Sequence, residues 1–144
     1  MRITETFVVA ASPEAVFDYM SNPANLAQWQ TSKTYVEQLT AGPPGVGTRV
    51  RERTKPPAGR EFEQVVEFTE FDRPSRFHVH IVDGPYPVDG TWTFAAAGAG
   101  TSVTFVAEGE LRGVMRVAEP LLKRGMAREF RGYHRNVQRN VASG

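Results

Sequence analysis

Two residues that could do acid–base chemistry fall within runs where apolar and polar side chains alternate. The hairpin registers argued below place Glu52 and Gln64 on the apolar side of these runs. Burying a carboxyl group without a partner is costly and favours its protonated or hydrogen-bonded form. Glu52 is therefore a candidate for orienting a ligand carbonyl or hydroxyl, or for general acid–base catalysis. The alternative is that Glu52 reaches water at the end of the sheet or at a bulge. Gln64 could orient the same ligand.

The histidines are the next candidates for chemistry. His78 and His80 lie two residues apart, so they share one face of a strand, an arrangement that suits metal ligation. The registers turn this face outward, beside Glu67 and Thr93. We therefore expect exposed histidines and no metal site. His134 lies among arginines of the C-terminal segment and is expected to be solvated.

Motifs for other kinds of catalysis are missing from the sequence. There is no GxSxG, HExxH, phosphate-binding glycine loop or dinucleotide fingerprint. The chain has no cysteine, which excludes a thiol nucleophile, a thiolate metal site and a disulfide framework. Glu129 could point inward from the C-terminal segment, but its neighbours Arg128 and Arg131 favour a solvated face. We expect no cofactor.

The length and the net charge of the chain limit the classes of function that it can have. A chain of 144 residues is long enough for one domain with its own core, and we expect a single domain over residues 1–144. The formal net charge is +1, which argues against nucleic acid as a partner. No apolar run approaches the length of a membrane span and no secretory signal is visible, so we expect a cytoplasmic protein without stable membrane insertion. Oligomeric state is left open.

The turn residues and the spacing of apolar residues predict the strands and helices that position these candidate residues. Residues 2–10 favour a strand. Ser12, Pro13 and Glu14 are typical of a helix start, which predicts a short helix over residues 13–20 and a second from Asn22–Pro23 to near Trp29. Extended runs rich in Val, Thr and Phe then alternate with Pro- and Gly-rich turns, the pattern of successive hairpins.

Centring each hairpin on its turn residues predicts the cross-strand partners. The predicted pairs are Arg53–Glu61, Arg51–Glu63, Val66–Ile81, Phe68–Val79, Glu67–His80, Val79–Trp92, Phe77–Phe94, Phe94–Val103 and Trp92–Phe105. All these registers place the apolar side chains on one face of the sheet and the polar side chains on the other. We therefore expect the apolar face to be covered and the polar face to be solvated. The apolar face comprises Val50, Phe62, Val66, Phe68, Phe77, Val79, Ile81, Trp92, Phe94, Val103 and Phe105.

The C-terminal segment is the candidate cover for this face. After Gly113 the apolar period changes to about 3.6, which predicts an amphipathic helix through Val137 with a kink or restart at Pro120. Gly125 and Gly132 form a stripe of small residues that either allows close approach to the sheet or leaves room beside the helix. Leu122 and Met126 would then face a pocket. The arginine- and lysine-rich side could bind a membrane surface or a partner, but is more simply a solvated outer face.

Several short motifs accompany this order of elements: ASPEAVFDYMSNP (residues 11–23), Trp29, GVGT (45–48), GTWTF (90–94), GTSVTF (100–105) and EPLL (119–122). Together they resemble the START/Bet v1-like (SRPBCC) superfamily, and within it the polyketide cyclase/dehydrase and lipid-transport group. The resemblance spans nearly the whole chain. It implies an α+β helix-grip fold: a curved antiparallel sheet of about seven strands around a long C-terminal helix, with two short helices after the first strand. The matching motifs are structural, so no catalytic residues carry over.

Three functions remain open. The first is binding or carriage of a small apolar molecule, lipid-, polyketide- or aromatic-like, between sheet and helix. The second is a polyketide cyclase/dehydratase-type reaction in the same pocket, with Glu52 for proton transfer. The third is a protein-interaction module with a filled core. The expected ligand-binding residues are Val50, Phe62, Gln64, Val66, Phe77, Val79, Ile81, Trp92, Phe94, Phe105, Leu122 and Met126.

Overall fold

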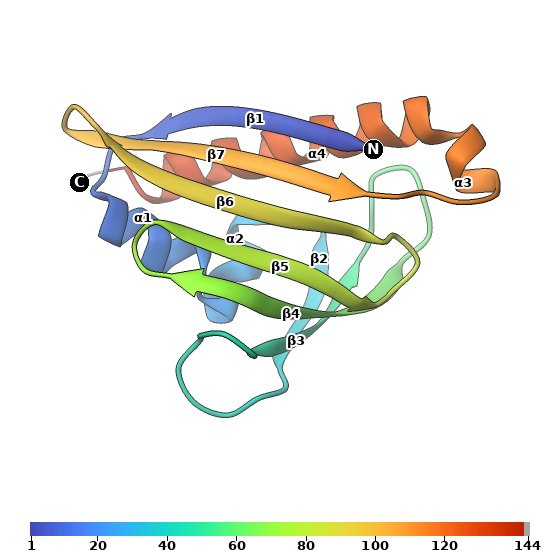
Figure 1. Cartoon of the computed structure of the whole chain (residues 1–144), viewed down its shortest axis with the longest axis horizontal. Helices are drawn as coiled ribbons and strands as arrows, with labels where there is room; N and C mark the ends of the chain where they lie inside the picture. Colours follow the sequence, from blue (N-terminus) through green and yellow to red (C-terminus); the bar gives the residue numbers. More distant parts are fainter. Residues whose placement is uncertain (143–144) are drawn as a thin grey trace.

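A curved antiparallel sheet carries all the helices on one side (Figure 1). The computed structural model describes residues 1–142. The strands are β1 (Arg2–Val9), β2 (Lys33–Gln38), β3 (Arg49–Thr54), β4 (Phe62–Asp72), β5 (Arg76–Asp83), β6 (Val88–Ala97) and β7 (Gly100–Gly109), in the spatial order β1-β7-β6-β5-β4-β3-β2. The helices are α1 (Pro13–Met20), η1 (Pro23–Asn25), α2 (Leu26–Trp29), α3 (Val114–Val117) and α4 (Glu119–Asn140). The predicted α+β helix-grip fold is confirmed.

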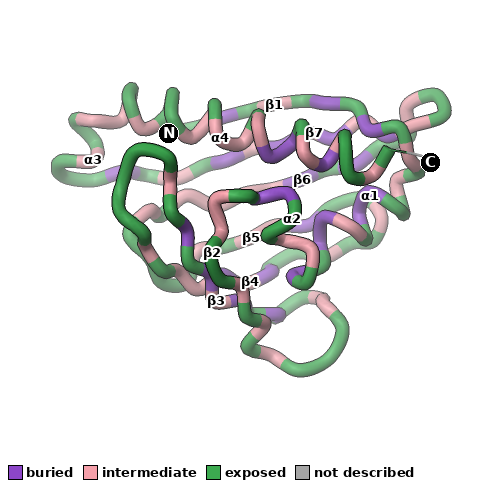
Figure 2. Tube along the Cα trace, turned by 180° about the vertical axis from the view of Figure 1, so that it is seen from behind, coloured by how far each residue is buried: buried purple, intermediate pink, exposed green. Residues whose placement is uncertain are grey.

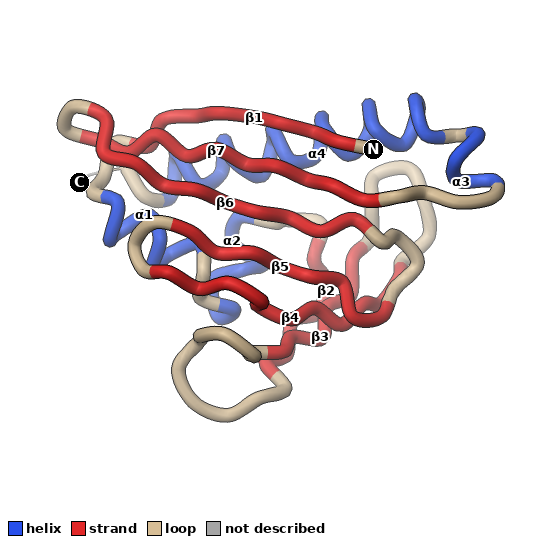
Figure 3. The backbone as a smooth tube through the Cα atoms, in the orientation of Figure 1, coloured by secondary structure: helices blue, strands red, loops and turns tan. Residues whose placement is uncertain are grey.

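The two short helices after β1 begin where the sequence predicts. The Ser12 side chain accepts a hydrogen bond from the Ala15 N–H at 3.2 Å, and Asn22 caps the following turn through Ala24. These side chains satisfy helix N–H groups that have no partner within the helix. Helix α1 contacts β6 and β7, and α2 contacts β2 and α4; Figure 3 traces the path of this segment from β1 to β2.

The predicted apolar face is confirmed, although two of the four hairpin registers were wrong by two residues. Arg53 pairs with Glu63 instead of Glu61, because the β3–β4 connection is centred on Ala58 and not on Pro57. Phe77 pairs with Trp92 instead of Phe94, because the β5–β6 connection is centred between Gly84 and Pro85 and not between Pro85 and Tyr86. A shift of two leaves every side chain on its predicted face. The predicted partners across the β4–β5 and β6–β7 turns are confirmed.

The C-terminal segment restarts at the predicted proline. α3 ends at Val117, and α4 begins at Glu119 with Pro120 in its first turn, where a missing N–H costs no helical bond. The far side of α4 is exposed (Figure 2), which confirms the predicted solvated basic face. The exposed cations of α4 are Lys123, Arg124, Arg128, Arg131, Arg135 and Arg139.

Candidate functional site

A cavity of about 1070 Å³ lies between the inner face of the sheet and α4. This volume is slightly above the range of about 300–1,000 Å³ that is typical of small-ligand sites. Strands β2 to β7 contribute to one wall, α4 forms the opposite wall, and the α1–α2 segment closes one end. The cavity reaches the surface between the β3–β4 loop and the start of α4, where Pro57, Ala58 and Leu121 are exposed.

The structure brings almost all the sequence-predicted ligand residues to this cavity. Its wall includes Val50, Phe62, Gln64, Val66, Phe77, Val79, Ile81, Trp92, Phe105, Leu122 and Met126. Phe94 is the exception and does not line the cavity. It packs against Phe17 of α1 with ring centroids 5.4 Å apart, because α1 covers this end of β6.

The glycines of α4 leave room beside the helix. Gly125 and Gly132 both line the cavity. An added Cβ at Gly125 would meet no atom within 4 Å, and one at Gly132 only the Arg135 guanidinium at 3.8 Å. Of the two interpretations of the small-residue stripe, open space is therefore correct at these two positions.

One part of the cavity wall is polar. Glu52 lies on the apolar face as predicted, is 5% exposed, and neither a bulge nor a strand end turns it to water. Gln64 lies directly opposite it and donates from Nε2 to Glu52 Oε1 at 2.7 Å. Lys33 Nζ lies 3.2 Å from the same oxygen and donates to Thr54 Oγ1 at 2.9 Å. A buried ion pair completed by neutral hydrogen bonds therefore lies inside the cavity wall. We refer to Lys33, Glu52, Thr54 and Gln64 as the polar wall.

Tyr133 of α4 faces the cavity from the opposite side and donates a hydrogen bond to Glu129. Burial raises the pKa of the Tyr133 hydroxyl well above its ordinary value, and the Glu129 carboxylate raises it further. Tyr133 is therefore a neutral donor at physiological pH. The prediction of a solvated Glu129 was wrong, because its side chain turns along the helix towards Tyr133 one turn on.

The prediction of a solvated His134 was also wrong. His134 is 1% exposed and stacks on Phe7 with ring centroids 4.3 Å apart. Trp92 Nε1 donates to His134 Nε2 at 3.1 Å, and His134 Nδ1 lies 2.6 Å from Glu5 Oε1. An indole N–H can only donate, so Nε2 carries a lone pair and Nδ1 carries the proton given to Glu5. Burial lowers the pKa of His134 although Glu5 opposes the shift, and the neutral ring fixes the Trp92 indole.

Trp29 is a cavity residue that was not among the predicted ligand-binding residues. It is fully buried at the end of α2, crosses Trp92 edge to face with centroids 5.9 Å apart, and lines the cavity. Its backbone carbonyl accepts from Asn136 of α4 at 3.0 Å. This bond ties the closed end of the cavity to the C-terminal helix.

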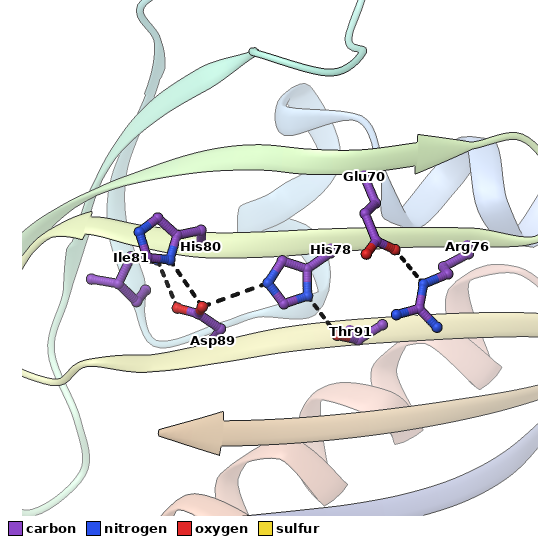
Figure 4. Close-up of polar contacts among 7 residues, drawn as sticks. All are labelled: Glu70, Arg76, His78, His80, Ile81, Asp89 and Thr91. Atoms are coloured by element: carbon purple, nitrogen blue, oxygen red, sulfur yellow. Dashed lines mark hydrogen bonds and ion pairs between the residues drawn. The ribbon is translucent and has the colours of Figure 1, made fainter. Parts of the chain in front are cut away.

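The histidine pair lies on the other face of the sheet, as predicted, but with partly different neighbours (Figure 4). Both rings turn towards Asp89. His80 Nδ1 lies 2.9 Å and His78 Nε2 lies 3.5 Å from Asp89 Oδ2. His78 also contacts Thr91 at 2.6 Å. Glu67 lies opposite His80 as predicted, whereas Thr91 takes the predicted place of Thr93 and Asp89 is an additional neighbour. Thr93 is instead opposite Arg76, because the β5–β6 register is shifted.

Asp89 has a structural role that accounts for this cluster. Its Oδ1 accepts from the Ile81 N–H at 3.0 Å where β5 and β6 separate. Burial raises the pKa of Asp89, but the hydrogen bonds from His80 and the Ile81 N–H outweigh it, and the carboxyl pKa lies below its ordinary value. Across residues 1–142 no cluster of three or more His, Asp or Glu side chains is arranged to hold a metal ion.

A family model described as polyketide cyclase / dehydrase and lipid transport matches residues 1–142. The chain belongs to this family. The match confirms the resemblance inferred from the motifs, and the family description links such chains to apolar small molecules. Comparison with curated proteins gave no match. Within residues 1–142, no helix combines the length and the apolar character that crossing a membrane requires.

Solved structures show the same fold at low sequence identity. A protein of Thermus thermophilus is 20% identical, with a TM-score of 0.84, and 98% of this chain and 97% of that chain are covered. A START superfamily protein of Mycobacterium smegmatis is 13% identical, with a TM-score of 0.78 and coverages of 97% and 96%. Ara h 8.0201 is 13% identical, with a TM-score of 0.68 and coverages of 98% and 97%. At these identities the likeness concerns the fold.

Proposed function

We propose that this protein binds a small apolar molecule in the cavity between the sheet and α4, to carry or sequester it. The observation that carries this proposal is the cavity itself, whose wall is formed largely by aliphatic and aromatic side chains. Each Å² of apolar ligand surface taken from water contributes about 25 cal/mol of affinity. Membership of a family described by lipid transport and polyketide chemistry supports the same ligand class.

A filled-core interaction module fits the structure less well. That alternative needs a core closed between Trp92, Gln64 and Met126, but all three residues line the same open volume. Their side chains come from two strands and from α4, so this space separates the two layers of the fold. A protein that used only its outer surface would gain stability from filling this volume, since packing defects are destabilising.

Catalysis in the same cavity is the second candidate function. It is favoured by the family description and by Glu52, a carboxylate inside an apolar cavity. Binding is placed first because Gln64 donates to Glu52 Oε1 and the Lys33 ammonium forms an ion pair with the same oxygen. These contacts hold the carboxylate as a fixed hydrogen-bond acceptor, and a general acid or base must exchange its proton with the substrate.

Titration with the neutral apolar dye Nile red tests the proposal. We expect saturable binding of one dye per chain, with a blue-shifted and enhanced emission, because the dye leaves water for an apolar cavity. A panel of lipids and aromatic molecules should displace it. A dye that stays in the aqueous state at every protein concentration would contradict the proposal.

A further inference from the structure

The polar wall has unused hydrogen-bonding capacity. Glu52 Oε1 accepts a hydrogen bond from Gln64 Nε2 and forms the ion pair with Lys33 Nζ. Among residues 1–142, neither Glu52 Oε2 nor Gln64 Oε1 forms a hydrogen bond or ion pair. In the described part of the chain, Trp29 Nε1 is the only fully buried side-chain nitrogen or oxygen without a partner. The two unpaired oxygens are therefore not sealed in protein. Because both side chains line the cavity, a ligand can reach these oxygens.

Lys33 adds one donor to these two acceptors. An ammonium group has three N–H donors. Lys33 donates one to Thr54 Oγ1, and a second can be directed at Glu52 Oε1, which lies 3.2 Å away. The Lys33 side chain is only 6% exposed, so its third donor belongs to the same enclosed region. The polar wall thus offers an excess of acceptors together with one donor, and its ion pair is neutral overall.

We propose that the polar wall recognises a neutral hydroxyl group on an otherwise apolar ligand. A hydroxyl donates one hydrogen bond and accepts others. It can therefore donate to Glu52 Oε2 or Gln64 Oε1 and accept from Lys33. This inference rests on the proposed function, since it assigns the chemistry of one end of the same ligand.

A carboxylate ligand fits the polar wall poorly. It has no proton to donate, and it would place a second negative charge beside Glu52, whose charge already pairs with Lys33. Arg128, Arg135 and Arg139 also line the cavity, but they lie on the exposed side of α4. An acid captured by these arginines would bind near the surface with its carboxylate away from the polar wall. A binding assay that compares the affinities of a neutral hydroxyl ligand and a carboxylate ligand therefore distinguishes the two ligand classes.

Displacement of Nile red by three probes of similar shape tests this inference at neutral pH. We expect 2-naphthol to bind at least tenfold more tightly than naphthalene, because its hydroxyl satisfies the polar wall. We expect 2-naphthoate to bind most weakly. Equal affinities for 2-naphthol and naphthalene, or tightest binding of 2-naphthoate, would overturn the hydroxyl assignment and leave apolar binding intact. Failure of Nile red itself to bind would overturn both proposals.

Variants of the polar wall test whether the preference for 2-naphthol over naphthalene depends on these residues. In Glu52→Gln the ratio of the naphthalene and 2-naphthol dissociation constants should fall below threefold, while Nile red still binds. Glu67→Gln, on the outer face of β4, is the matched control and should keep the wild-type ratio. If Glu52→Gln does not fold, Gln64→Met serves instead, because it removes one acceptor and should lower the ratio. An unchanged ratio in the folded variant would contradict the inference.

Discussion

Replacing Glu52 by leucine should lower the free energy of unfolding by about 3 kcal/mol. The substitution leaves the Lys33 ammonium, whose side chain is 6% exposed, with Thr54 as its only partner among residues 1–142. It also removes the acceptor of Gln64 Nε2. We expect the lower end of the range for buried ion pairs, because the cavity can admit water to the orphaned charge. Urea unfolding followed by tryptophan fluorescence measures the loss.

The double variant Lys33→Met/Glu52→Leu should be more stable than Glu52→Leu alone, since no unpaired charge remains. The control is Glu67→Leu, which removes the partner of Arg49 from a pair at 2.8 Å on the outer face. Arg49 stays in water, so this change should cost within about 0.5 kcal/mol. Equal stabilities of Glu52→Leu and Glu67→Leu would show that Glu52 is solvated and that the polar wall is not enclosed.

Filling the space beside α4 should abolish ligand binding without unfolding the protein. The double variant Gly125→Phe/Gly132→Phe inserts two aromatic rings from positions that line the cavity and have room for a side chain. We expect the affinity for Nile red to fall at least tenfold. Dye titration with a thermal melt of each variant measures binding and folding separately.

The matched control is Gly125→Ala/Gly132→Ala. Each Gly→Ala change in a helix interior contributes about 1 kcal/mol, so this variant should gain about 2 kcal/mol of stability and keep its dye affinity. Unchanged dye affinity in the phenylalanine variant, with the fold intact, would place the dye outside the cavity.

The fold and the apolar wall could be predicted because a register error of two residues does not change which face of the sheet a side chain lies on. The β3–β4 and β5–β6 pairings were each wrong by two residues, yet Val50, Phe62 and Val79 all line the cavity. Side-chain direction in a strand repeats every two residues. A shift of two therefore changes the partners but preserves the face.

The polar contacts could not be predicted in the same way. Lys33 is the first residue of β2, and its partner Glu52 is 19 positions away; alternation alone does not identify such a pair. His134 was misassigned because its neighbours in sequence are basic, whereas its neighbours in space are Glu5 and Trp92. The helical spacing does indicate that His134 is buried, because it lies four residues after Phe130 and three before Val137, and both of these are apolar positions of α4.

The methionine methyl groups give the most direct test that an apolar ligand occupies the cavity. Met20 and Met126 line it, whereas Met115 does not. In protein labelled with ¹³C at the methionine methyl groups, we predict that Nile red shifts the NMR signals of Met20 and Met126 and leaves that of Met115 unchanged. A shift confined to Met115, or none at saturating dye, would contradict a ligand between the sheet and α4.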